Sequence, residues 1–168
     1  MLYTILKSTA EKLISEVKLN LKLVFPQFSD IFENTPIQLI SGRDILTQTN
    51  RIAIEIGAPQ VRELDDTAAT TLVGKYIFAI VVYFRRVPEY IFKHFLFHEF
   101  GHIISIADNR EIYDEIQKDT AQDIHTPVRS GGALWSEMIA EVFAYRIEKN
   151  SFAPYKGYAL YKIEEKLD

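Results

Sequence analysis

Residues 88–104 read PEYIFKHFLFHEFGHII, and this stretch decides how the rest of the chain can fold. Its apolar residues recur at spacings of three and four, so they surround a helical axis almost completely. They are Ile91, Phe92, Phe95, Leu96, Phe100, Ile103 and Ile104. Pro88 suits the first turn of a helix, where a backbone N–H is not needed. The pattern predicts a central helix that is buried on nearly all sides.

The same stretch carries His98, Glu99 and His102 in the motif H-E-x-x-H. Histidines four positions apart project from one helix face on successive turns, so their imidazoles can bind one ion. Since the chain has no cysteine, a metal would be held by histidine and carboxylate, which suits Zn²⁺. A zinc ion lowers the pKa of bound water, and Glu99 can act as the general base that takes its proton.

A catalytic zinc site needs a third protein ligand and one open position. Glu137 and Glu141 lie one turn apart in a second predicted helix. In this interpretation Glu137 is the third ligand, and Glu141 accepts the second N–H of a ligating imidazole. Asp108, six residues after His102, is the alternative third ligand, although its position also suits the end of a helix. His94, one turn before His98, is expected to be a surface or outer-shell residue.

The residues before the motif predict a helix and three strands. Leucine, isoleucine and valine at spacings of three and four indicate an amphipathic helix over 9–24. Apolar runs indicate strands over 37–40 and 75–85, and alternation of isoleucine with Ala53 and Glu55 indicates a strand over 51–57. The polar stretch 62–71 is expected to be a loop. The apolar residues of the third run do not alternate, so both faces of that strand should be covered.

The residues after the motif predict a helical part. We expect, in order, a helix over 109–123, a loop over 125–132, a helix over 134–149 and a terminal helix over 155–166. The chain is therefore expected to form a single α+β domain over residues 1–168. Its sheet part would span about residues 1–87, and its active-site and C-terminal helices about residues 88–168.

Composition and charge exclude several classes of partner. The 23 acidic and 19 basic side chains give a net charge of -4, without a Lys/Arg block that would follow a phosphate backbone. The N-terminus continues as a charged amphipathic segment, unlike a secretory signal. The longest apolar run, 76–84, is about half of the roughly 20 residues of a membrane span. We expect a cytoplasmic protein that binds neither nucleic acid nor membrane; delivery to another cell and the oligomeric state stay open.

The two motifs resemble those of the gluzincin group of zincin metallopeptidases, in which H-E-x-x-H is followed by a helix bearing E-x-x-x-D. The matching positions here are His98, Glu99 and His102, then Glu137 and Glu141, with glutamate in place of the final aspartate. The form H-E-F-G-H is also similar to the small intracellular metallopeptidases of the ImmA/IrrE type. The stretch IAEVFA at 139–144 partly meets the E-A-N-x-F-A pattern of that family.

The resemblance implies a small twisted, mostly antiparallel sheet packed on the active-site helix. It also implies an edge strand before that helix that binds extended substrate, and residues 75–85 stand in that position. Zincins usually supply one more donor for the oxyanion. We favour His125, in the loop between the two motif helices, over the other candidates, which are Arg129, Tyr145, Tyr155 and Tyr158. The expected function is zinc-dependent hydrolysis of peptide bonds in a protein or peptide. The alternative is a zinc-containing regulatory or toxin-like binding protein on the same scaffold, without peptidase activity.

Overall fold

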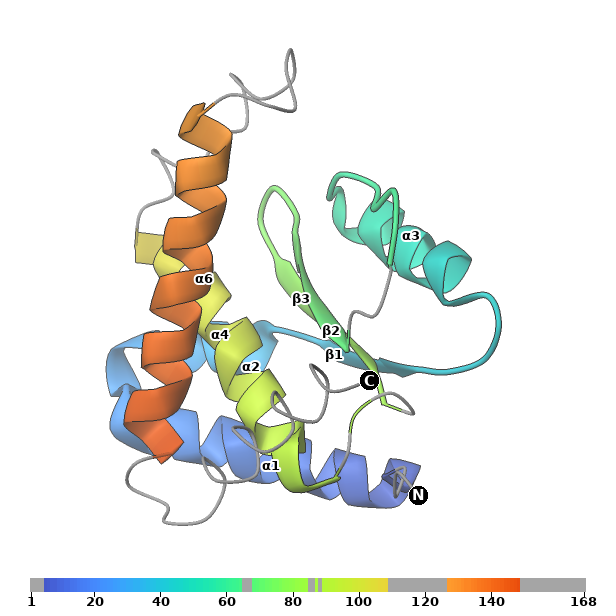
Figure 1. The fold of residues 1–168 in the computed structure, drawn as a ribbon. Helices are drawn as coiled ribbons and strands as arrows, with labels where there is room; N and C mark the ends of the chain where they lie inside the picture. Colours follow the sequence, from blue (N-terminus) through green and yellow to red (C-terminus); the bar gives the residue numbers. More distant parts are fainter. Residues whose placement is uncertain (1–4, 65–67, 85–86, 88, 109–126, 149–168) are drawn as a thin grey trace, which may run out of the picture.

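A computed structural model describes residues 5–64, 68–84, 87, 89–108 and 127–148 of the chain (Figure 1). The helices and strands are α1 (Lys7–Val24), α2 (Ser29–Asn34), β1 (Ile37–Ile40), α3 (Ile45–Ile56), β2 (Ala69–Val73), β3 (Phe78–Tyr83), α4 (Phe92–Asp108) and α6 (Pro127–Glu148). Short 3-10 turns, Pro26–Phe28 and Glu89–Ile91, precede α2 and α4. The described part is α+β and mostly helical, which confirms the α+β class expected from the sequence.

Three parts of the sequence-based prediction lie outside the described residues: the helix over 109–123, His125 and the terminal helix over 155–166. Across the ranges given above, no helix has both the length and the apolar character that a bilayer-spanning segment requires. The helix expected over 9–24 and the strand over 37–40 are confirmed as α1 and β1.

The sheet contains three strands in the order β1-β3-β2. Strand β3 pairs in parallel with β1 and antiparallel with β2, so the sheet is mixed rather than mostly antiparallel. The strand expected over 75–85 is therefore the central one, and its assignment as an edge strand is wrong. The edge next to α4 is formed by β2, whose residues 69–71 were assigned to a loop. Two consecutive β-branched residues, Thr70 and Thr71, favour this strand.

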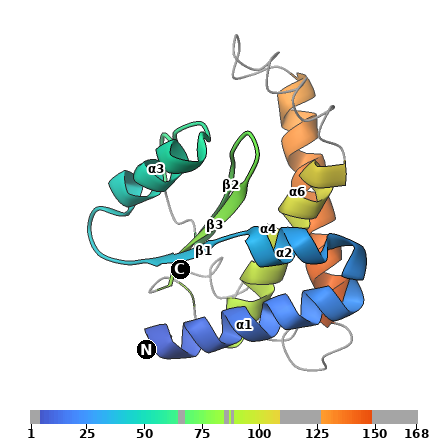
Figure 2. The same cartoon turned by 180° about the vertical axis from the view of Figure 1, so that it is seen from behind.

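Both faces of β3 are covered, as its unbroken apolar run predicts. Ile80 and Val82 belong to a core that includes α1 and α4, whereas Val81 and Tyr83 belong to a second core beneath α3. Figures 1 and 2 show α3 on one side of the β2–β3 hairpin and α4 with α6 on the other. A central strand between two cores has no wet face, and this is why its sequence lacks alternation.

The strand expected over 51–57 is wrong, because these residues continue helix α3. Thr49, Ile52 and Ala53 are buried at helical spacing, whereas Ile54 is 63% exposed. The helix ends at Gly57, whose left-handed φ of 68° favours glycine, and whose N–H donates to the carbonyl oxygens of the last turn. Alternation of isoleucine with smaller or polar residues is therefore compatible with a helix when only one stripe is buried.

The loop expected over 125–132 is wrong for residues 127–132, which form the first turns of α6. Pro127 is the first helical residue, where a missing N–H costs nothing. Gly131 and Gly132 lower the intrinsic helix propensity by about 1 kcal/mol each. Helix α6 packs along α4, and such tertiary contacts commonly override a weak local propensity.

Substitution Tyr83→Phe tests the placement of α3 as a helix on the sheet. The Tyr83 hydroxyl lies 3.1 Å from the buried Thr49 hydroxyl, which donates to the Ile45 carbonyl. Loss of this bond should lower the unfolding free energy by about 0.5–1.5 kcal/mol in urea titrations. The matched control Tyr76→Phe removes a hydroxyl from a side chain that is 86% exposed, and it should leave stability within about 0.5 kcal/mol of wild type. Equal effects of the two variants would contradict this arrangement.

Candidate metal centre

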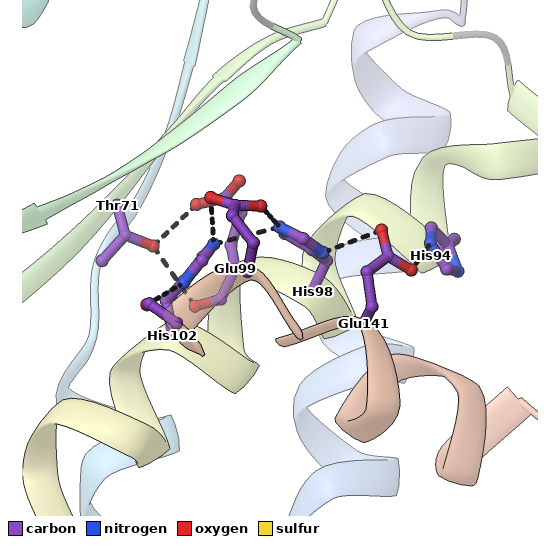
Figure 3. Close-up of polar contacts among 8 residues, drawn as sticks. Thr71, His94, His98, Glu99, His102 and Glu141 are labelled. Atoms are coloured by element: carbon purple, nitrogen blue, oxygen red, sulfur yellow. Dashed lines mark hydrogen bonds and ion pairs between the residues drawn. The ribbon is translucent and has the colours of Figure 1, made fainter. Parts of the chain in front are cut away.

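Helices α4 and α6 run antiparallel and join a row of polar side chains (Figure 3). His98 and His102 project from one face of α4 on successive turns, and Glu137 and Glu141 do the same from α6. The side chains of the two helices interdigitate. Glu141 contacts His98, and Glu137 contacts both His98 and His102. This row brings together four of the residues that the sequence singles out.

The donor atoms of His98, His102 and Glu137 converge on one point. One ligand atom from each of the three residues lies within 4.8 Å of the others. The two Nε2 atoms are 3.0 Å apart, and they lie 3.3 and 3.5 Å from the Glu137 carboxylate oxygens. Ligands at zinc-bond lengths around a tetrahedral ion are separated by about 3.3 Å. The spacing of this donor set therefore fits a zinc ion.

The other ring nitrogen of each histidine has its own partner on α6. His98 Nδ1 lies 3.3 Å from Glu141 Oε1, and His102 Nδ1 lies 2.8 Å from the Ser136 hydroxyl. A partner at Nδ1 fixes the ring orientation and leaves Nε2 directed at the convergence point. Both histidine side chains are only 13% exposed, whereas Glu137 is 61% exposed. The histidine side of the group of converging donor atoms is thus largely buried, and the Glu137 side is exposed to solvent.

The electrostatics of the group favour a cation. Burial lowers the pKa of His98, but hydrogen bonds to Glu137 and Glu141 outweigh it and raise that pKa to about 10. Burial and the neighbouring His98 charge lower the pKa of His102 to about 4. Hydrogen bonding to His98 holds the pKa of Glu137 below its usual value, and bonds to His94 and His98 outweigh burial in lowering that of Glu141. Two carboxylates are therefore kept ionised around a position that suits positive charge.

The Glu99 side chain projects from α4 at about 100° around the helix axis from that of His98, and it points towards the sheet. It is 6% exposed, and the Thr71 hydroxyl on β2 lies 2.7 Å from its Oε2 and 3.2 Å from its main-chain oxygen. Burial raises the pKa of Glu99. His98 and His102 thus face α6, while the Glu99 carboxylate faces Thr71 on β2 and is close enough to His98 and Glu137 for their charges to affect its pKa (Figure 3).

Gly101 allows this close approach of the helices. A Cβ at this position would lie 2.7 Å from Ala140 Cα and 3.2 Å from Phe143 Cβ. In the sequence, Gly101 is only a variable position of the H-E-x-x-H motif, and no local pattern there marks Ser136 or Thr71 as contacts of this group. A glycine inside a strongly apolar helix is the one signal of close helix contact that the sequence offered.

Asp108, the alternative third ligand, lies apart from the converging donor atoms. Asp108 is the exposed last residue of α4, which continues past His102 without a bend. Six residues of helix carry it about 9 Å along the axis and to another face, so it does not join the His98, His102 and Glu137 group. His125 lies outside the described residues.

Substitution Gly101→Ala should separate α4 from α6. Helix propensity alone would add about 1 kcal/mol of stability, whereas overpacking against backbone costs about 1–3 kcal/mol. Because the nearest atom is a backbone Cα, overpacking should dominate, and both the unfolding free energy in urea and the zinc affinity should fall. A variant that is more stable than wild type and binds zinc equally well would contradict the close approach.

Substitution Glu137→Gln tests the third ligand directly. An amide oxygen is a weak zinc ligand, so the zinc affinity should fall by more than the roughly 10–100-fold loss that follows removal of an outer-shell partner. Asp108→Asn is the matched control and should bind zinc like wild type. Chelator competition at constant pH measures both affinities, and a larger loss in Asp108→Asn would reverse the assignment.

Comparison with known proteins adds no assignment to this geometry. No family model matches the chain, and neither a curated protein nor a solved structure matches it.

Proposed function

We propose that this protein is a zinc-dependent hydrolase that cleaves peptide bonds, with a zincin-like fold. The observation that carries the proposal is the convergence of His98, His102 and Glu137 beside the buried carboxylate of Glu99. Ligation alone does not require Glu99, whereas hydrolysis needs a general base next to the metal. The choice of peptide bonds rests on the resemblance of the two helical motifs to those of gluzincin peptidases.

The ion would be held by His98, His102 and Glu137, with the exposed side of the group left for water and substrate. Zinc, when bound, polarises the substrate carbonyl and makes a neighbouring water acidic enough to react near neutral pH. Glu141 and Ser136 hold the two imidazoles through Nδ1, so neither ring has to reorient when the ion enters.

Glu99 would act as the proton carrier of the reaction. The Thr71 hydroxyl donates to Glu99 Oε2, and the Glu99 carboxylate takes a proton from the attacking water. The carboxylate can then deliver that proton to the leaving amine. Burial, which raises the pKa of Glu99, strengthens this carboxylate as a base. Thr71 thereby restricts the base to one orientation.

Strand β2 supports an extended peptide as the substrate. It pairs with β3 along one edge, and within the described strands nothing pairs with its other edge. An extended peptide can add to such an edge through main-chain hydrogen bonds. Because Thr71 lies on β2 and contacts Glu99, a peptide paired there would pass close to the base.

Substitution Glu99→Gln separates hydrolysis from simple zinc binding. The variant should keep its zinc, because Glu99 is not a ligand, while the cleavage rate should fall by about 10²–10⁴-fold with the loss of the base. The assay is mass spectrometry of a mixed peptide library incubated with zinc-loaded protein. Glu55→Gln, on the far side of the sheet in α3, is the control and should cleave like wild type.

Two outcomes would count against the peptidase. Equal cleavage by wild type and Glu99→Gln would show that Glu99 is not the base. Unchanged biological activity of Glu99→Gln, together with bound zinc and no detectable cleavage by wild type, would favour the regulatory or toxin-like binding protein.

A further inference from the structure

His94 is a buried histidine of α4 that the proposed chemistry does not use. It lies one turn before His98 on the same helix face, and its exposed fraction is 1%. A buried imidazole requires polar partners, since an unsatisfied polar group in a core is costly. Its Nε2 lies 3.5 Å from Glu141 Oε2, on the side of Glu141 away from the metal-type ligands (Figure 3).

The Glu141 carboxylate therefore bridges two histidines of α4. Oε1 faces His98 Nδ1 at 3.3 Å, and Oε2 faces His94 Nε2 at 3.5 Å. The Glu141 side chain is 41% exposed, so other rotamers that extend into solvent are open to it. The contacts of Oε1 with His98 and of Oε2 with His94 both favour the rotamer in which the carboxylate reaches His98.

We propose that His94 is a positioning residue of the metal centre, which holds Glu141 so that Glu141 can fix the ring of His98. The inference rests on the proposed zinc site and extends it by one residue. His94 does not itself approach the ion, because the group whose donor atoms converge consists of His98, His102 and Glu137. Its influence on zinc must therefore pass through Glu141.

The expected size of the effect follows from this indirect route. Loss of a group that orients a metal ligand typically lowers metal affinity by about 10–100-fold. Without His94, the Glu141 carboxylate loses the contact at Oε2, and zinc binding should weaken towards the level of Glu141→Gln. A second substitution at Glu141 should then add little, because both changes break the same chain of contacts.

The experiment compares two amides at position 94. Gln places its amide N–H₂ near the position of the histidine Nε2 and should keep most of the wild-type zinc affinity. Asn carries the same amide on a side chain one methylene shorter, cannot reach Glu141, and should lose affinity within the range of about 10–100-fold. His94→Phe removes the polar group altogether, and its zinc affinity should match that of His94→Asn. Chelator competition gives the affinities.

Two further measurements separate positioning from a general loss of structure. The Co²⁺-substituted proteins should show an altered visible absorption spectrum in His94→Asn but not in His94→Gln. Urea unfolding of the zinc-free proteins gives their stabilities. If His94 has a positioning role, His94→Asn and His94→Phe should bind zinc more weakly even at temperatures where every variant is folded. Should Phe fail to fold, the Asn and Gln pair still decides the question.

The outcomes distinguish this inference from the proposed function. If wild type binds no zinc, both are overturned. If wild type binds zinc and His94→Asn binds it equally well, only the role of His94 is overturned. The same conclusion follows if His94→Asn lowers affinity as much in the Glu141→Gln background as alone, because the effect would not pass through Glu141.

Discussion

Where α4 crosses α6, the backbones come so close that position 101 has no room for a side chain. A Cβ on Gly101 would fall within 2.7 Å of Ala140 Cα. The interlocking row of histidines and glutamates depends on this contact, because imidazole and carboxylate groups meet within 3.5 Å only when the helix axes are close. The helix-to-helix distance is thus a precondition of the metal-type geometry.

The row also explains how polar groups can lie on a helix that is otherwise apolar. The imidazoles of α4 that turn towards α6 lie beside a carboxylate or a hydroxyl there, which lowers the cost of burying them. The glutamates supply more negative charge than the histidines can neutralise, since burial keeps the pKa of His102 low. An added cation at the convergence point would complete the charge balance.

The motif could be predicted from the sequence, and so could the nature of its helix. Histidines four apart share one helix face at any tertiary arrangement, so His98 and His102 had to lie side by side. The apolar residues around them surround the helix axis, so most of that surface had to be buried. Glu137 and Glu141 followed from the same spacing rule, once a second helix was expected. These inferences are local, and they depend only on helix geometry.

What required the tertiary structure was the set of partners drawn from distant parts of the chain. Thr71 contacts Glu99 only because β2 is the edge strand, and the pairing of three short strands is not encoded in any one of them. Part of the segment 45–56 shows the alternation of apolar and other residues that is typical of a strand, yet the segment forms a helix. A helix needs only one apolar stripe to pack on the face of the sheet, and Ile52 and Ala53 lie in that stripe. The sequence determined which groups could do chemistry. The approach of α4 to α6 and to β2 decided which of them meet, because contacts across many residues depend on the whole core rather than on local spacing.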